Sequence, residues 1–131
     1  MAFIPMNSGS GGGLTETDLW TNPSPTSSFG SDTVTLSQSY KNFDYLKISF
    51  RWSTSDSTSF SAIIPKATLE SNVERTFAIG GNLSSSGKAR TRVGYASSET
   101  SIYISNSYQL VTTTQSANSN YIIPTKISGL K

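Results

Sequence analysis

Few residues in this sequence could carry out acid–base or nucleophilic chemistry. It contains neither histidine nor cysteine, which excludes a Ser-His-Asp triad, a Cys-His dyad and a zinc centre of the usual kind. A serine activated by a lysine remains, as does a pair of carboxylates within about 5–10 Å that hydrolyses a glycoside. Most of the carboxylates fall in predicted turns, where aspartate bonds to nearby backbone groups. The sequence therefore predicts a protein that is not an enzyme and has no catalytic residues, cofactor or metal site. The carboxylates are Glu16, Asp18, Asp32, Asp44, Asp56, Glu70, Glu74 and Glu99.

Three cationic side chains alternate along one segment, at Lys88, Arg90 and Arg92. Three charges on one face of a strand could meet phosphate or an acidic glycan. The same spacing is typical of a solvent-exposed strand face, or of an edge that charge protects from aggregation. We favour an exposed face or a protected edge over a binding site, because nucleic-acid-binding proteins show a broader basic footprint and the net charge is only +2. No nucleic-acid partner is expected.

Aromatic side chains could bind a ligand or another protein by stacking against it. Those on inward faces of the predicted strands, and so in the expected core, are Phe50, Trp52, Phe60 and Phe77. Those on outward faces or in loops are Tyr40, Tyr45, Tyr103 and Tyr108. An amphipathic ring can stack on a sugar while its hydroxyl forms a hydrogen bond, but tyrosine is also enriched at protein interfaces. These four tyrosines are candidates for a glycan site and, more strongly, for a subunit interface.

The N-terminal segment 1–13 differs from the rest of the chain. Three apolar side chains, Phe3, Ile4 and Met6, precede the run NSGSGGG, which is typical of a flexible linker. One interpretation is an anchor that binds a partner or a sister subunit through these side chains; the other is a tail that lies on its own domain. The segment lacks the pattern of a secretory signal, and no stretch is expected to span a membrane.

Residues 14–131 are predicted to form a single all-β domain. Thr, Ile, Val, Tyr and Phe recur throughout, which favours sheet, and no window shows a helical period. The clearest strand is Tyr45–Trp52, in which Leu46, Ile48, Phe50 and Trp52 alternate with outward-facing residues. Seven or eight short antiparallel strands predict a β-sandwich with a jelly-roll-like arrangement. The other strands are expected at Thr33–Leu36, Ser59–Ile64, Val73–Ile79, Lys88–Ala96, around Ile102 and Ile104, at Tyr108–Thr112 and at Tyr121–Ile127.

Three local features complete this expectation. The run GGNLSSSG at 80–87 predicts a turn. Pro124 predicts that the last strand lies at a sheet edge or contains a bulge. Leu19 and Trp20 are expected to pack as a plug on the end of the sheet.

Two stretches carry a resemblance to a known group of proteins. They are LWTNPSPTSSFGSDTVTLSQSYKNFDYLKISFRWSTS (19–55) and YIIPTKISGLK (121–131). With an aromatic-Thr-Asn opening and a closing IPxKIxGLK-like pattern, they resemble small tail-associated and receptor-binding proteins of phages that infect Gram-positive gut bacteria. The resemblance implies a virion component, made in the bacterial cytoplasm, that is oligomeric (most plausibly trimeric) and acts in assembly or host attachment. It carries no catalytic residues across.

The sequence thus favours a structural or adhesive virion protein, such as a tail-fibre, baseplate or head-fibre component. It is expected to form a homo-oligomer and to join other virion proteins through residues 1–13, with a host cell-wall glycan as a further candidate partner. The alternative is a free-standing carbohydrate-binding module, and a third, weaker interpretation is a small glycan hydrolase.

Overall fold

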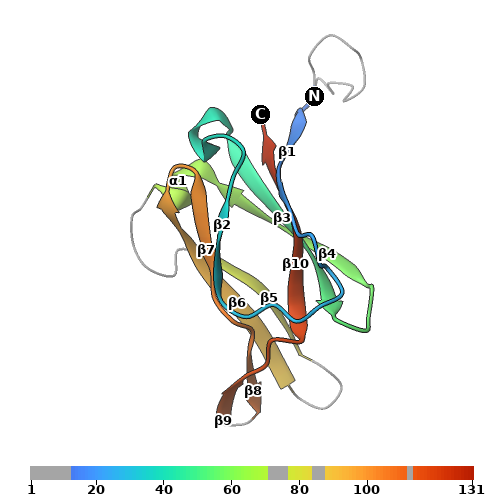
Figure 1. Ribbon diagram of the computed structural model, residues 1–131. Helices are drawn as coiled ribbons and strands as arrows, with labels where there is room; N and C mark the ends of the chain where they lie inside the picture. Colours follow the sequence, from blue (N-terminus) through green and yellow to red (C-terminus); the bar gives the residue numbers. More distant parts are fainter. Residues whose placement is uncertain (1–12, 71–76, 84–87, 112–113) are drawn as a thin grey trace, which may run out of the picture.

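The computed structural model describes residues 13–70, 77–83, 88–111 and 114–131. They form an antiparallel β-sandwich with ten strands (Figure 1). This confirms the predicted fold class, with more strands than the seven or eight expected. The strands are β1 (Glu16–Thr21), β2 (Asp32–Thr35), β3 (Tyr45–Ser53), β4 (Ser59–Pro65), β5 (Phe77–Leu83), β6 (Lys88–Ser98), β7 (Ser101–Ile104), β8 (Tyr108–Val111), β9 (Thr114–Ala117) and β10 (Tyr121–Leu130). A 3-10 turn, η1 (Tyr40–Asn42), and one helical turn, α1 (Lys66–Leu69), complete the described elements.

The strands divide into two sheets. The first sheet has the order β1-β10-β3-β4, and the second has the order β2-β7-β6-β8-β9, with β5 paired to β6. β5 pairs with β6 at positions that also pair with β7 or β8. Since a strand has only two sides, β7 and β8 must lie end to end along the other side of β6. The connection between them therefore interrupts the ladder beside the middle of β6.

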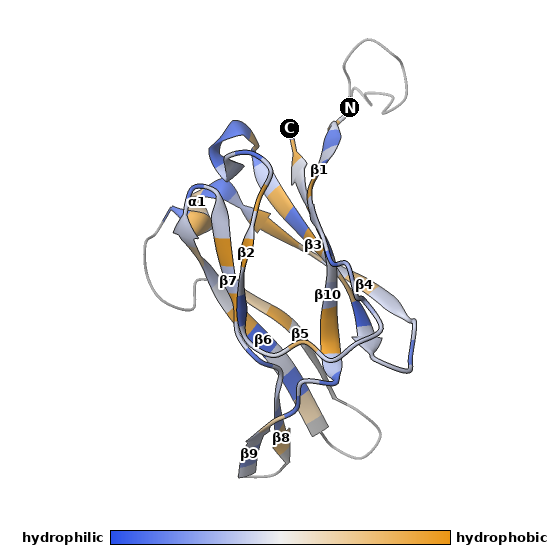
Figure 2. Ribbon diagram, viewed as in Figure 1, coloured by the Kyte–Doolittle hydropathy of each residue, from blue (hydrophilic) through white to orange (hydrophobic). Residues whose placement is uncertain are grey.

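The core lies between the two sheets and is largely aliphatic. In β3, Leu46, Ile48 and Phe50 are buried and Trp52 is half-buried against the core. The alternation predicted for this strand is therefore confirmed. Figure 2 shows apolar bands on strands of both sheets, while β6 carries hydrophilic bands. The buried isoleucines are Ile48, Ile64, Ile79, Ile102, Ile104, Ile122, Ile123 and Ile127.

An aromatic row continues the core toward one end of the sandwich. Phe50 stacks on Phe60 with 5.5 Å between ring centroids, and Phe60 meets Trp52 edge-on at 6.1 Å. Trp52 in turn meets Tyr121 edge-on at 6.0 Å. With Phe77, which is buried, all four aromatics expected in the core do contact it.

Two local expectations concern the first sheet, and one of them is wrong. Leu19 and Trp20 belong to β1, which pairs with β10, and so do not plug the end of a sheet. Pro124 lies in β10, a central strand between β1 and β3. Its bulge was expected and is present between Pro124 and Lys126, which lets a residue without an N–H occupy a central strand.

The predicted strand Val73–Ile79 and the predicted turn at 80–87 are only partly described. Residues 71–76 and 84–87 lie outside the described part of the chain. β5 continues through Gly80, Gly81 and Asn82 to Leu83, with a register shift between Gly80 and Leu83. The glycine pair is therefore part of a bulged strand and not of a turn.

β5 and β10 approach closely at one point. Gly80 has φ 94°, and a Cβ added there would lie 2.6 Å from Ile122 Cδ1. Ile122 itself has φ 52°, a left-handed conformation that a β-branched residue adopts only when its surroundings impose it. A side chain at position 80 would collide with this strained isoleucine.

Candidate functional site

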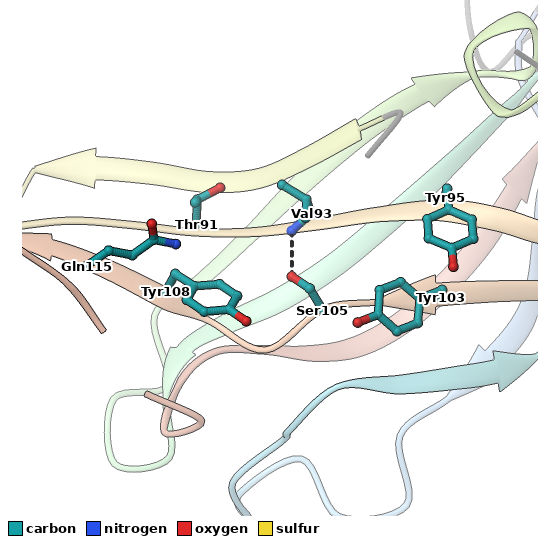
Figure 3. Close-up of a pocket in the computed structure, with 7 residues that line it drawn as sticks. All are labelled: Thr91, Val93, Tyr95, Tyr103, Ser105, Tyr108 and Gln115. Atoms are coloured by element: carbon teal, nitrogen blue, oxygen red, sulfur yellow. Dashed lines mark hydrogen bonds between the residues drawn. The ribbon is translucent and has the colours of Figure 1, made fainter. Parts of the chain in front are cut away.

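The outer face of the second sheet contains a hollow of about 300 Å³. Three tyrosines contribute to it, Tyr95 of β6, Tyr103 of β7 and Tyr108 of β8. Its other lining residues are Thr91, Val93, Ser105 and Gln115 (Figure 3). This volume lies at the lower end of the range of small-ligand sites, which is roughly 300–1,000 Å³. We refer to these seven residues as the tyrosine hollow.

The break between β7 and β8 produces the hollow. Tyr95 pairs with Tyr103, and Thr91 pairs with Tyr108, but no strand pairs with Val93 on that side. Ser105 replaces the missing strand, because its N–H donates to the Val93 carbonyl at 2.8 Å and its hydroxyl accepts from the Val93 N–H at 3.0 Å (Figure 3). The backbone of β6 thus stays satisfied while Tyr103 and Tyr108 are held apart.

The tyrosine rings are arranged around this gap. Tyr95 and Tyr103 lie 5.1 Å apart between ring centroids, with 34° between their planes. Figure 3 shows the hydroxyls of Tyr103 and Tyr108 directed toward each other across the gap. Among the described residues that line the hollow, none carries a charge. The site therefore offers aromatic faces, phenol hydroxyls and a glutamine amide to an uncharged ligand.

Arg92 supports the hollow from inside the sandwich. It is fully buried, and its guanidinium donates to five backbone carbonyls at 2.6–3.1 Å. One of these is the carbonyl of Ser105, at 2.7 Å. The others belong to Phe29, Gly30, Tyr121 and Ile122. Burial lowers the pKa of Arg92 to about 10, so the side chain stays charged at neutral pH.

Arg90 lies two residues before Arg92 in β6 and therefore on the same inner face of the sheet. It is 5% exposed, and its guanidinium carbon lies 3.8 Å from the ring centroid of Tyr121 and 5.6 Å from that of Trp52. Its Nη2 donates to Gln109 Oε1 at 3.3 Å, whereas Nε has no hydrogen-bond partner among the described residues. Cation–π contacts of this kind strengthen when water is excluded.

These positions overturn the interpretation of the cationic cluster. Arg90 and Arg92 do not form an exposed or edge-protecting strand face; they point into the sandwich, while Thr91, Val93 and Tyr95 face outward. Neither arginine is available to an anionic ligand at the surface. The side chain of Lys88 lies outside the described part of the chain.

The structure separates the four candidate tyrosines. Tyr103 and Tyr108 meet in the hollow, and Tyr45 is exposed on the first sheet. Tyr40 is buried, at 5% exposure, so its ring is not an exposed stacking surface. Burial, with Glu70 and Glu99 nearby, raises its pKa. Tyr95 also lines the hollow but was not among the predicted site residues. It alternates with Arg90 and Arg92, and because these were expected to face outward, Tyr95 was assigned to the inner face.

The described carboxylates lie away from the hollow. Glu16 and Asp18 on β1 both contact Lys126, at 3.6 and 3.3 Å, and Glu16 also contacts Lys47 at 3.3 Å. A hydrogen bond from Ser128 lowers the pKa of Glu16. Burial opposes this shift, and Lys47 and Lys126 lower the pKa further. A glycosidase acid needs the opposite shift. No group of three or more acidic residues could hold a metal ion within the described ranges.

The proposed anchor residues Phe3, Ile4 and Met6 lie outside the described residues. Within the described part, no helix is long and apolar enough to cross a membrane.

Comparison with protein-family models, with curated proteins and with solved structures gives no match to this chain. Its function is therefore inferred from the chemistry of the described site.

Proposed function

We propose that this chain is a non-enzymatic attachment module that binds a glycan through the tyrosine hollow. The observation that carries the proposal is the pair of phenol hydroxyls, Tyr103 and Tyr108, directed into one gap on a rigid sheet face. Tyrosine can stack on the apolar face of a sugar ring and bond to its hydroxyls at the same time. The glutamine in the lining adds a further neutral hydrogen-bonding group.

Two features favour binding over hydrolysis. The residues that line the hollow include no carboxylate, although glycoside hydrolysis needs two. The site also lies on β6, which Arg92 fixes to segments of both sheets, and a rigid element suits a preformed binding surface.

The resemblance of residues 19–55 and 121–131 to phage tail-associated proteins supports a role for this binding in a virion. We propose that the module is part of a virion, within a tail fibre, baseplate or head fibre, and that its glycan belongs to the host cell wall. A free-standing carbohydrate-binding module would use the same hollow and remains the alternative.

The proposal is tested by screening the purified protein against an array of bacterial cell-wall polysaccharides and neutral oligosaccharides. Binding is expected, and Tyr103→Ala and Tyr108→Ala should each weaken it roughly tenfold, the equivalent of about 1.4 kcal/mol. Tyr45→Ala removes an equally exposed ring from the other sheet and is the matched control.

Two outcomes would contradict the proposal. One is a protein that binds no glycan on the array while its circular dichroism spectrum is that of a folded β protein. The other is a binding activity that Tyr45→Ala reduces as much as Tyr103→Ala does.

A further inference from the structure

A second hollow, of about 260 Å³, adjoins the tyrosine hollow on the same sheet face. Thr91, Tyr108 and Gln115 line both of them, so Tyr108 stands between the two as a shared wall. Ala89 of β6 and Leu110 of β8, which are directly opposite each other in the ladder, belong to the second hollow only.

We infer that the two hollows form one groove that binds an extended, uncharged, N-acetylated oligosaccharide, with sugar rings on both sides of Tyr108. This inference rests on the proposed function and adds the length and the chemical class of the glycan. We refer to the combined surface as the β6 groove.

The length of the groove argues for several sugar rings. Its floor follows the outward-facing positions of β6 from Ala89 to Tyr95, which are six residues apart. At about 3.3 Å per residue this is roughly 20 Å, too long for one ring. The arrangement is continuous because Leu110 pairs with Gln115 of β9 and Thr91 with Tyr108, which keeps all four side chains on one face.

The two halves of the groove differ in chemistry. The first half presents phenol hydroxyls and a glutamine amide, which suit ring hydroxyls. The second half presents the methyl groups of Ala89 and Leu110, and Leu110 is 45% exposed. An apolar substituent on an otherwise polar sugar would cover this leucine, and the methyl of an acetamido group has the required size.

The groove also selects against charged sugars. Arg90 is the one charged residue among those described as lining the two hollows. It is 5% exposed, and its guanidinium packs against the Tyr121 ring and donates to Gln109 Oε1. An anionic glycan would therefore lose hydration and meet only a guanidinium that is already covered by Tyr121 and bonded to Gln109.

The test uses chito-oligosaccharides of one to six N-acetylglucosamine units, with cello-oligosaccharides of equal length as their unacetylated counterparts. Titration calorimetry should show affinity for the acetylated series rising at least about tenfold between one and four units. The cello-oligosaccharide of four units should bind several times more weakly than the acetylated tetramer, whereas the single units of the two series should bind alike, because only the longer chain reaches Leu110. Leu110→Ser should weaken binding of the acetylated tetramer severalfold and leave binding of the single unit unchanged, whereas Tyr103→Ala should weaken both.

Leu14→Ser is the matched control, because Leu14 is also an exposed leucine, at 53%, and lies just before β1 of the other sheet. Affinity that does not depend on length, or a Leu110→Ser variant that binds the tetramer normally, would overturn the extended groove and leave the tyrosine hollow in place. Equal binding of the two tetramers, or binding of neither series by a protein that binds other glycans on the array, would overturn the acetamido assignment. Failure on the whole array would instead count against the proposed function.

Discussion

Arg92 is bonded to more backbone groups than any other described side chain, and every one of its five bonds reaches a carbonyl. These carbonyls come from the loop before β2, from the β7–β8 connection and from the start of β10. A guanidinium has five N–H donors, so all of them are used. In this chain, which has few apolar residues, Arg92 thus joins these three segments by hydrogen bonds.

We expect Arg92→Met to lower the free energy of unfolding by about 3–5 kcal/mol, the range for breaking a buried polar network by removing one partner. Five carbonyls would lose the donor that Arg92 supplies, and the bonds to two of them, Ser105 and Ile122, are buried. Methionine of similar length would only fill the space. Arg92→Lys should also destabilise the protein, because an ammonium group has only three donors. Urea unfolding followed by circular dichroism measures the effect. Arg51→Met, which removes a half-buried arginine with one bond, to the Ser53 carbonyl, should cost about 1 kcal/mol or less; equal losses in both variants would refute the role of Arg92.

Gly80 allows a second prediction at a single position. Gly80→Ala would place a methyl group 2.6 Å from Ile122 Cδ1 at a φ of 94°, so we expect a loss of roughly 1–3 kcal/mol from strain and overpacking. Gly30→Ala is the control, since nothing lies within 4 Å of a Cβ there. That variant should be neutral or slightly more stable. If the melting temperatures of the two variants agree, the close approach of β5 and β10 is wrong.

The faces of β6 show why part of the site could not be predicted. Alternation correctly separated Arg90 and Arg92 from Thr91, Val93 and Tyr95. Alternation does not say which of the two sets is buried, and hydropathy favoured burial of the set that contains Val93 and Tyr95. The arginines point inward because carbonyls from distant loops and the Tyr121 ring satisfy them, and no local pattern in the sequence reports such partners.

At the level of elements, β3 is where sequence and structure agree best. It runs between β10 and β4, one of its faces meets the core, and its apolar side chains therefore recur with the period of a strand. β10 was harder to predict, because Pro124 is usual only at edges and bulges, and the bulge here lies inside a central strand. At the bulge the Pro124 carbonyl accepts a hydrogen bond from a side chain, Asn22 Nδ2, at 2.8 Å.

Truncation within β3 should reveal its contribution to the core. Phe50 is buried and stacks on Phe60, so Phe50→Ala removes both apolar burial and a ring contact. We expect a loss of roughly 3–5 kcal/mol, measured by denaturant unfolding. Tyr45→Ala at the exposed start of the same strand should cost much less, and a comparable loss there would mean that the assignment of faces in β3 is wrong.

Considered as a whole, the molecule has two distinct ends. Thr15 and Lys131 exchange two backbone hydrogen bonds, at 2.9 and 3.1 Å, so the start of β1 and the end of β10 lie together. The β8–β9 hairpin projects from the opposite end (Figure 1). If the protein is attached to a particle through the end that holds Thr15 and Lys131, the part of the β6 groove next to this hairpin lies far from the attachment point.

Self-association is the first prediction at this scale. Ile63 is 52% exposed on the outer face of the first sheet, and Tyr45 on the neighbouring strand is exposed as well, so this face offers apolar area to a second copy. We expect light scattering to give about three times the mass of one chain, the trimer being implied by the resemblance to phage proteins. Ile63→Lys should shift the mass toward the monomer, whereas Leu110→Lys on the other sheet should not. A monomer mass for the unaltered protein at all concentrations would contradict the prediction.

The last prediction concerns residues 1–13 as an attachment segment. A protein that starts at Leu14 keeps every described strand and the bonds between Thr15 and Lys131, so it should fold with an unchanged β-type circular dichroism spectrum. It loses Phe3, Ile4 and Met6, whose burial by a partner would supply the binding energy, and the run NSGSGGG, which would span some 15 Å as a flexible chain. We therefore expect the truncated protein to bind glycans normally but to be missing from purified particles, as measured by mass spectrometry. Replacing Phe3, Ile4 and Met6 together by serine should give the same loss with the linker intact, because the linker provides reach and the apolar side chains provide affinity. Incorporation of the truncated protein at the normal level would refute the anchor, and failure of that protein to fold would assign the segment to the domain's own core.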